Sequence, residues 1–87
     1  MVIWKYGLPL FLSVIEVDMP EGAVVRHVGD QFESLFIWVE CDPDRALVTR
    51  RFVVIGTGQR VPDGAEYCGT AMAAEGSLVW HVYECVS

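Results

Sequence analysis

Short runs of β-branched and aromatic residues alternate with turn-forming residues along the whole chain. Val, Ile, Phe, Tyr and Trp fill the runs, and Gly, Pro and Asp separate them at intervals of about a dozen residues. The pattern predicts strands near residues 2–6, 12–18, 23–29, 34–40, 47–55, 66–72 and 78–85. Turns are expected at Gly7–Pro9, Met19–Gly22, Gly29–Asp30, Asp42–Asp44, Gly56–Gly58, Pro62–Gly64, Gly69 and Gly76.

Hydrophobic and polar residues alternate strictly in the run 14–19. Ile15, Val17 and Met19 fall on one face, whereas Glu16 and Asp18 fall on the other. A period of two residues is typical of a strand with one buried face. We therefore expect this run to border a hydrophobic core.

Two other runs are apolar on both faces. In the run 34–40, Phe36 and Trp38 oppose aliphatic residues, and the run 78–85 has the same character. Such strands lie inside a sandwich or under a partner subunit. A small domain covers few strands on both faces from within, so the pattern predicts a homo-oligomer.

A helical period is not evident in the sequence. The only alanine-rich segment, 70–75, is short and lies between Gly69 and Gly76, so Ala73–Gly76 is expected as a hairpin turn between the last two strands. The predicted fold class is all-β. It is a single small antiparallel domain over residues 1–87, a meander, sandwich or barrel of about six to seven strands.

Composition adds a surplus of apolar surface to this picture. The chain has 87 residues, of which 53% are hydrophobic and 21% charged, and its mean hydropathy is +0.36. A chain of this length buries only about two-thirds of its unfolded surface. The excess favours burial against another chain, with self and a host protein as the expected partners.

Charge and apolar run length exclude two classes of partner. Twelve acidic residues against six basic ones give a net charge of −6, whereas binding along a nucleic-acid backbone requires clustered positive charge. No apolar run approaches the roughly 20 residues that span a bilayer. We expect a protein that binds neither nucleic acid nor membrane.

Three cysteines point to a reducing compartment. Cys41, Cys68 and Cys85 are an odd number without tight spacing, unlike the frameworks of small secreted domains. The apolar segment after Lys5 is interrupted by Pro9 and lacks a cleavage site, so it does not resemble a signal peptide. The expected location is the cytoplasm.

Metal binding has little support in the spacing of potential ligands. Strong zinc motifs hold two ligands on short Cys-x-x-Cys or His-x₃₋₅-His segments. His81 and Cys85 are four residues apart, and on one strand they lie about 13 Å from each other. We expect no metal and no other cofactor.

A small anionic ligand is the main alternative to protein binding. Gly56 and Gly58 precede Arg60 in a segment that offers amide groups and a guanidinium to an anion. The structural alternative is a turn in which glycine adopts positive φ. Arg50 and Arg51 point to opposite faces of one strand, where one pairs with a carboxylate and the other is free for an acidic ligand.

No group of residues indicates catalysis. Cys41 precedes Asp42 and Pro43, which suit the first two positions of a type I turn. A nucleophilic cysteine needs a neighbouring base, and the sequence does not supply one. We expect a protein that is not an enzyme.

Aromatic residues are the best candidates for an interface. Trp and Tyr dominate the residues that contribute most to binding energy in protein complexes. Phe36, Trp38, Trp80 and Tyr83 are the candidates. The same side chains would also suit a core or the wall of a pocket for a planar ligand.

The order of several short motifs resembles a known family. The motifs are Ile3-Trp4-Lys5, Met19–Ala23, Trp38 with Asp42-Pro43, Arg50-x-Phe52, Gly56-Thr57-Gly58, Tyr67-x-Gly69-Thr70 and Leu78–Val82 with Glu84. They resemble a family of short phage and bacterial proteins classified as a domain of unknown function. The resemblance covers nearly the whole chain and implies a phage or prophage accessory protein; the three cysteines depart from the family pattern.

Three functional hypotheses follow, in this order. The first is a non-enzymatic accessory protein that binds a host or phage protein as a homo-oligomer in the host cytoplasm. The second is a binding protein for a small, nucleotide-like anion that uses Arg50, Arg51 and Arg60 beside an aromatic wall, and it predicts that these arginines converge on one pocket. The third is a minor structural protein of the virion.

Overall fold

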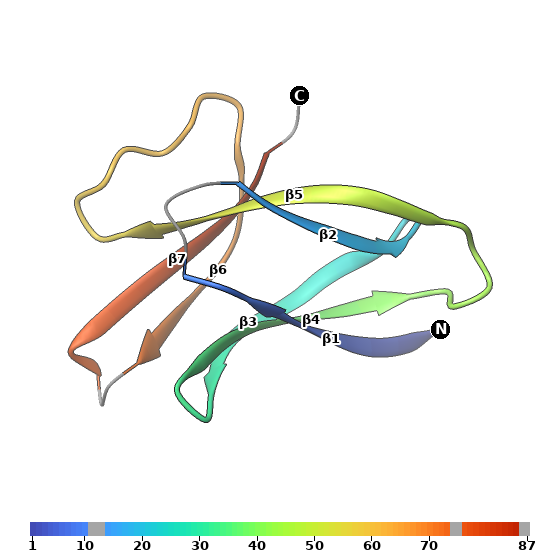
Figure 1. The fold of residues 1–87 in the computed structure, drawn as a ribbon, viewed down its shortest axis with the longest axis horizontal. Coiled ribbons are helices and arrows are strands. Elements are labelled where there is room, and N and C mark those ends of the chain that lie inside the picture. The colour runs from blue at the N-terminus through green and yellow to red at the C-terminus, as the bar shows by residue number, and fades with distance from the viewer. Residues whose placement is uncertain (11–13, 74–75, 86–87) are drawn as a thin grey trace.

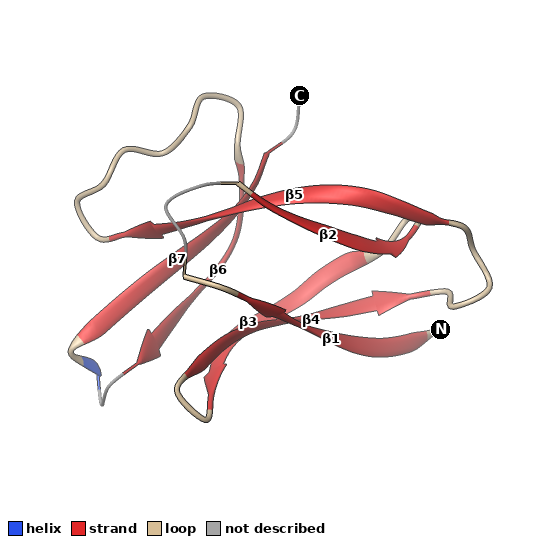
Figure 2. Cartoon of the chain, in the orientation of Figure 1, coloured by secondary structure: helices blue, strands red, loops and turns tan. Residues whose placement is uncertain are grey.

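The computed structural model describes residues 1–10, 14–73 and 76–85. Strands and the loops between them make up almost all of this part of the chain, apart from a short helical turn before β7 (Figures 1 and 2), which confirms the all-β class. The strand bounds are β1 (Val2–Leu8), β2 (Ile15–Pro20), β3 (Val24–Gln31), β4 (Ser34–Cys41), β5 (Leu47–Gly56), β6 (Glu66–Ala73) and β7 (Leu78–Cys85). In this part of the chain, no helix is long and apolar enough to cross a membrane.

The strands form two antiparallel sheets. Sheet A has the order β1-β4-β3, and sheet B has the order β2-β5-β7-β6. The chain enters sheet B at β2, returns to sheet A for β3 and β4, and ends with β5 to β7 in sheet B. Of the architectures that the sequence leaves open, the structure is therefore the two-sheet one and not a closed barrel.

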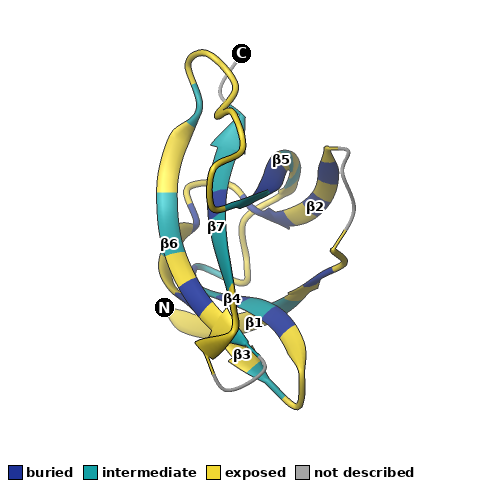
Figure 3. Cartoon of the chain, turned by 90° about the vertical axis from the view of Figure 1, so that its left-hand side faces the viewer, coloured by how far each residue is buried: buried dark blue, intermediate teal, exposed yellow. Residues whose placement is uncertain are grey.

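The core lies between the two inner faces. On β2, Ile15, Val17 and Met19 are buried while Glu16 and Asp18 are exposed, as the alternating pattern predicts. Figure 3 shows buried and exposed residues following one another along β2. The buried hydrophobic cluster is Leu8, Ile15, Val17, Met19, Ala23, Val28, Leu35, Ile37, Val39, Cys41, Phe52, Val54, Ala71 and Val82.

The turn after β4 forms as the sequence predicts. The backbone amide of Arg45 donates to the carbonyl oxygen of Asp42 at 3.1 Å, and the amide of Asp44 donates to Oδ1 of Asp42 at 3.0 Å. The aspartate side chain thus replaces a backbone acceptor at the start of the turn. The expected turn at 73–76 includes residues 74 and 75, and the expected strand at 12–18 begins at residues 12 and 13; these four lie outside the described residues.

Three expected turn positions lie inside strands instead. Gly7, Gly29 and Gly69 belong to β1, β3 and β6. The turn predicted at Gly29–Asp30 is wrong, because β3 continues to Gln31. At Gly29 and Gly69, glycine provides room for a neighbouring side chain rather than a change of direction.

Gly69 shows this most clearly, where β6 of sheet B meets β3 of sheet A. A Cβ on Gly69 would lie 2.7 Å from Cγ2 and 2.9 Å from Cβ of Val28, whose side chain is buried. Both atoms belong to a short, branched side chain that cannot move aside. The missing side chain therefore lets the two sheets approach closely at this position.

We expect Gly69→Ala to lower the free energy of unfolding by about 1–3 kcal/mol, because the new methyl group overlaps Val28. Gly7→Ala is the matched control, since a Cβ there would meet Phe36 at 3.4 Å, an ordinary contact. Both changes restrict the unfolded chain equally. Urea unfolding followed by circular dichroism compares them, and equal stabilities for the two variants would contradict the steric explanation.

Candidate functional site

The outer face of sheet A carries an aromatic cluster where a two-sheet protein ordinarily has polar residues. The ring centroids of Phe36 and Trp38 are 6.1 Å apart, and those of His27 and Trp38 are 5.5 Å apart. Nζ of Lys5 lies 4.7 Å from the centre of the Phe36 ring and donates to Oε1 of Gln31 at 2.8 Å. We call His27, Phe36 and Trp38, with Lys5, the outer aromatic cluster.

Glycine lets these rings lie close to the sheet. A Cβ on Gly29 would lie 3.0 Å from Nε2 of His27 and 3.2 Å from the Trp38 ring. Phe36 and Trp38 are consequently half-buried although they face outward. The second apolar face of β4 is thus partly covered from within the chain.

The four predicted interface residues do not share one surface. Phe36 and Trp38 lie on the outer face of sheet A. Tyr83 lies on sheet B in edge contact with Tyr67, at 5.4 Å between ring centroids. Trp80 packs against the buried cluster.

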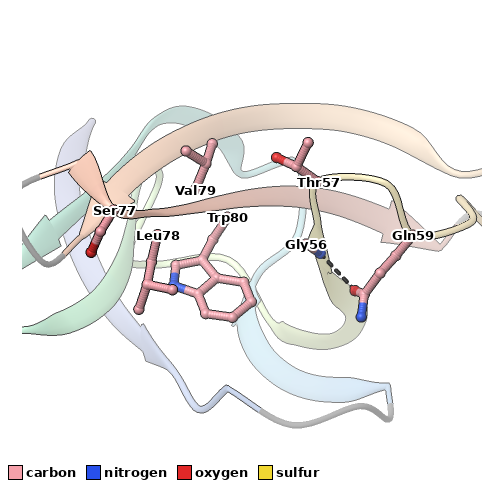
Figure 4. A pocket seen from close by; sticks show the side chains of 7 residues that line it. All are labelled: Gly56, Thr57, Gln59, Ser77, Leu78, Val79 and Trp80. Carbon is pink, nitrogen blue, oxygen red and sulfur yellow. Dashed lines mark hydrogen bonds between the residues drawn. The ribbon is translucent and has the colours of Figure 1, made fainter.

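A hollow of about 520 Å³ lies between the turn after β5 and the start of β7 (Figure 4). Gly56 lines it, and its amide donates to Oε1 of Gln59 at 2.7 Å. The indole N–H of Trp80 has no hydrogen-bond partner among the described residues, and the nitrogen is covered by protein atoms. A molecule in this hollow would therefore meet apolar atoms of Trp80 and Leu78 rather than the indole N–H.

A second hollow, of about 270 Å³, contains Arg50. The guanidinium group donates to both carboxylate oxygens of Glu84 at 2.7 Å and also to the backbone carbonyl of Ala23. Hydrogen bonding to Glu84 raises the pKa of Arg50 further above its ordinary value. The cross-strand ion pair expected for one of the two neighbouring arginines is therefore present. It neutralises the positive charge that would otherwise attract an anion.

The other residues of the predicted ligand set are separated. Arg51 is exposed on β5 and, by the strand's two-residue period, faces away from Arg50. Arg60 is exposed in the loop between β5 and β6. Gly58 has a φ of +90° in the turn, so it serves the chain reversal. Neither hollow gathers more than one of the three arginines.

Cys68 lines the second hollow beside Glu84 and Arg50. Burial raises the pKa of its thiol to about 11; the Glu84 carboxylate adds to the rise and the Arg50 guanidinium opposes it. The thiol is therefore protonated at neutral pH and is a poor nucleophile. None of the three cysteines forms a disulfide.

His81 joins a chain of hydroxyl groups on sheet B. Its Nε2 is 3.0 Å from Oγ1 of Thr57, and its Nδ1 is 3.0 Å from Oγ1 of Thr70. The Thr70 hydroxyl is in turn hydrogen-bonded to that of Tyr67. Both ring nitrogens are engaged, so a metal ion would have to displace a hydroxyl; among the described residues, no three potential ligands cluster. This series of hydrogen bonds could not be predicted from the sequence, because it depends on the pairing of Thr70 with His81 across two strands.

The hairpin between β3 and β4 turns on two residues in an unusual conformation. Gln31 pairs with Ser34, so Phe32 and Glu33 alone form the loop. Their φ angles are 54° and 64°, in the left-handed region that Asn-Gly pairs usually occupy in such turns. The Phe32 side chain is 91% exposed. No turn residue marks this position in the sequence, and it was not predicted.

We expect Glu33→Gly to raise the free energy of unfolding by about 0.5–1 kcal/mol, because glycine adopts positive φ without steric strain. Glu16→Gly, at an exposed position inside β2, is the control and should lower stability by a similar amount. Thermal unfolding measures both. A loss of stability in both variants would show that the turn is not strained.

The reaction of Cys68 with iodoacetamide should become about tenfold faster per pH unit from pH 8 to pH 10, because the thiolate is the reactive form. At pH 8 a thiol with a pKa of about 11 is ionised in roughly one molecule per thousand. Peptide mass spectrometry reports the rate for Cys68 separately from those for the other two cysteines. A rate that levels off near pH 9 would contradict the burial of this thiol.

Comparison with known proteins places the chain in a family without supplying a function. No curated protein and no solved structure matches it. The model of the family described as Domain of unknown function (DUF7352) matches residues 1–87, which confirms the resemblance to a short uncharacterised family. The protein belongs to the DUF7352 family.

Proposed function

We propose that this protein is a non-enzymatic interaction protein, which binds another protein and works as a homo-oligomer. The observation that carries the proposal is Phe32, an aromatic side chain that is 91% exposed at the tip of a hairpin. Large aromatic side chains that enter a partner's pocket are typical anchors of protein complexes. A two-residue turn holds this one clear of the rest of the molecule.

The conformation of the turn supports a role beyond chain reversal. Phe32 and Glu33 both have positive φ, which costs about 1–2 kcal/mol for each residue with a side chain. Asn-Gly would close the same hairpin without this strain. Strained backbone of this kind clusters at functional sites.

Charge indicates the kind of pocket that would receive the ring. Asp30 and Glu33 flank Phe32 in the sequence and are exposed, and the whole chain carries a charge of −6. We infer a partner with an apolar pocket and a basic rim. Such complementarity chiefly accelerates association and selects the partner.

The titratable groups near the hollows support the non-enzymatic part of the proposal. Arg50 is paired with Glu84, both nitrogens of His81 are hydrogen-bonded, and burial keeps the Cys68 thiol protonated. Each of these groups therefore has a structural role. The phage or prophage setting, and with it the host cytoplasm, comes from the family resemblance and belongs to the same proposal.

Site-specific cross-linking tests the location of the binding surface. A photoreactive benzoylphenylalanine replaces Phe32, and in a second variant it replaces Leu47, which is 61% exposed at the start of β5. After irradiation in cells that naturally produce the protein, we expect a defined cross-linked protein with the first variant only. Equal cross-linking from both positions would contradict a specific site at Phe32.

We expect Phe32→Asn to weaken binding of that cross-linked partner by at least about tenfold, because the anchor is lost. The variant should fold at least as stably as the original chain, because Asn tolerates positive φ. Titration calorimetry measures the affinity and thermal unfolding the stability. Unchanged affinity in a folded variant would exclude Phe32 as the anchor.

A further inference from the structure

The outer edge of β1 is open and apolar. Within residues 1–10, 14–73 and 76–85, β1 pairs with β4 on one side, in a continuous register from Val2 to Leu8, and with no strand on the other. Three neighbouring side chains on it, Val2, Ile3 and Trp4, are 39%, 56% and 37% exposed. A regular apolar edge of this kind is a template for pairing with another strand.

The three other edge strands carry features that hinder such pairing. β3 has a bulge between Val25 and His27, and β6 has one between Tyr67 and Gly69. β2 exposes two acidic side chains and ends in Pro20. Bulges, inserted charges and proline are the usual protections of a free edge. β1 has neither a bulge nor a proline, and its one charged residue is Lys5.

Lys5 does not protect the edge, because its side chain points away from it. Its Nζ lies over the Phe36 ring on β4 and donates to Gln31 on β3. The ammonium group therefore crosses sheet A toward the opposite border. The open side of β1 is left without a charge.

Charge along the chain favours a second copy as the occupant of this edge. All acidic residues lie at position 16 or later, so the segment that contains β1 carries one lysine and no carboxylate. Two copies with a charge of −6 each repel one another, and this repulsion is weakest where carboxylates are absent. On the neighbouring strand, Glu40 pairs with Ile3 but forms an ion pair with Arg26 at 2.8 Å, so neither β1 nor β4 presents an unpaired carboxylate to a second copy.

We propose that β1 pairs in antiparallel fashion with β1 of a second copy, about a two-fold axis perpendicular to the sheet. The two copies of sheet A then form one continuous sheet in the order β3-β4-β1-β1-β4-β3. This inference rests on the proposed function, which includes self-association, and specifies its surface. The contact is closed, because each copy uses the same edge, the one that lacks such protection among the described strands.

Side-chain alternation restricts the register. Directly opposed residues share a face of the sheet, so the axis passes through a residue of β1 rather than between two residues. An axis at Lys5 would oppose two lysines, and an axis at Ile3 would pair Met1 to Lys5 only. An axis at Trp4 pairs Met1 through Gly7 and brings the two Trp4 rings together, a favourable cross-strand pair.

In this register the outer face opposes Ile3 to the partner's Lys5, on each side of the axis. Ile3→Lys would therefore place a lysine opposite the partner's Lys5 position twice, where the two side chains repel each other although Lys5 leans toward Gln31. The double variant Ile3→Lys/Lys5→Glu would place opposite charges there. In the register centred on Ile3, by contrast, the introduced lysines would face each other and the second change would not relieve them.

Sedimentation velocity of the full chain over a range of concentrations tests the pairing. We expect a dimer for the original chain, a dimer dissociation constant at least about tenfold higher for Ile3→Lys, and recovery of most of this loss in the double variant. Leu47→Lys is the control, because this residue is equally exposed but lies on β5. It should leave the dimer unchanged, and circular dichroism confirms that every variant is folded.

The possible contrary results separate this inference from the proposed function. A dimer that Ile3→Lys does not weaken overturns pairing through β1, while self-association stands. A weakened dimer that the second change does not restore overturns the Trp4 register. A monomeric original chain overturns both the pairing and the homo-oligomer, whereas binding through Phe32 is decided separately by cross-linking at that position.

Discussion

This short chain buries its hydrophobic side chains chiefly between the inner faces of its two sheets, and the rest of the structure depends on that constraint. The buried cluster contains side chains from both sheets and consists of aliphatic residues, Phe52, Met19 and Cys41. Each apolar residue beyond this set must find cover on an outer face or at an edge. The outer aromatic cluster, the open edge of β1 and Phe32 are three places where such residues lie.

These three places differ in how far the chain itself buries the apolar side chains. On the outer face of sheet A, Gly29 leaves space for the rings of His27 and Trp38, so the cluster is half-buried without a partner. On β5, Arg50 is half-buried and its guanidinium is hydrogen-bonded to Glu84 and to the carbonyl oxygen of Ala23. Val2, Ile3 and Phe32 have no comparable cover. The exposed apolar residues thus include three neighbours on β1 and one at a hairpin tip, besides single residues on other strands and loops.

Much of the fold could be predicted from the sequence, because strand periodicity is a local property. The run from Ile15 to Met19 alternates as a half-buried strand must, and Asp42 and Pro43 form the expected turn. Glycine did not reliably predict turns, because Gly58 lies in a chain reversal whereas Gly69 lies where two sheets approach each other closely. Three features depend on which strands pair and could not be predicted from the sequence. They are the open two-sheet arrangement instead of a closed barrel, the contact of Arg50 with Glu84 and the contact of His81 with Thr70. The turn at Phe32 was missed because neither of its residues is one that favours such a turn.

The pairing of β1 with β4 also has a consequence for how the protein is made. β1 leaves the ribosome before its hydrogen-bonding partner β4, which begins at Ser34 and lies beyond β2 and β3 in the chain. At about 5–20 residues per second, this strand waits for a time on the order of seconds before β4 exists. Its apolar segment is then open on both sides, and only later is one side closed. β1 is therefore open to mispairing during synthesis until β4 has been made.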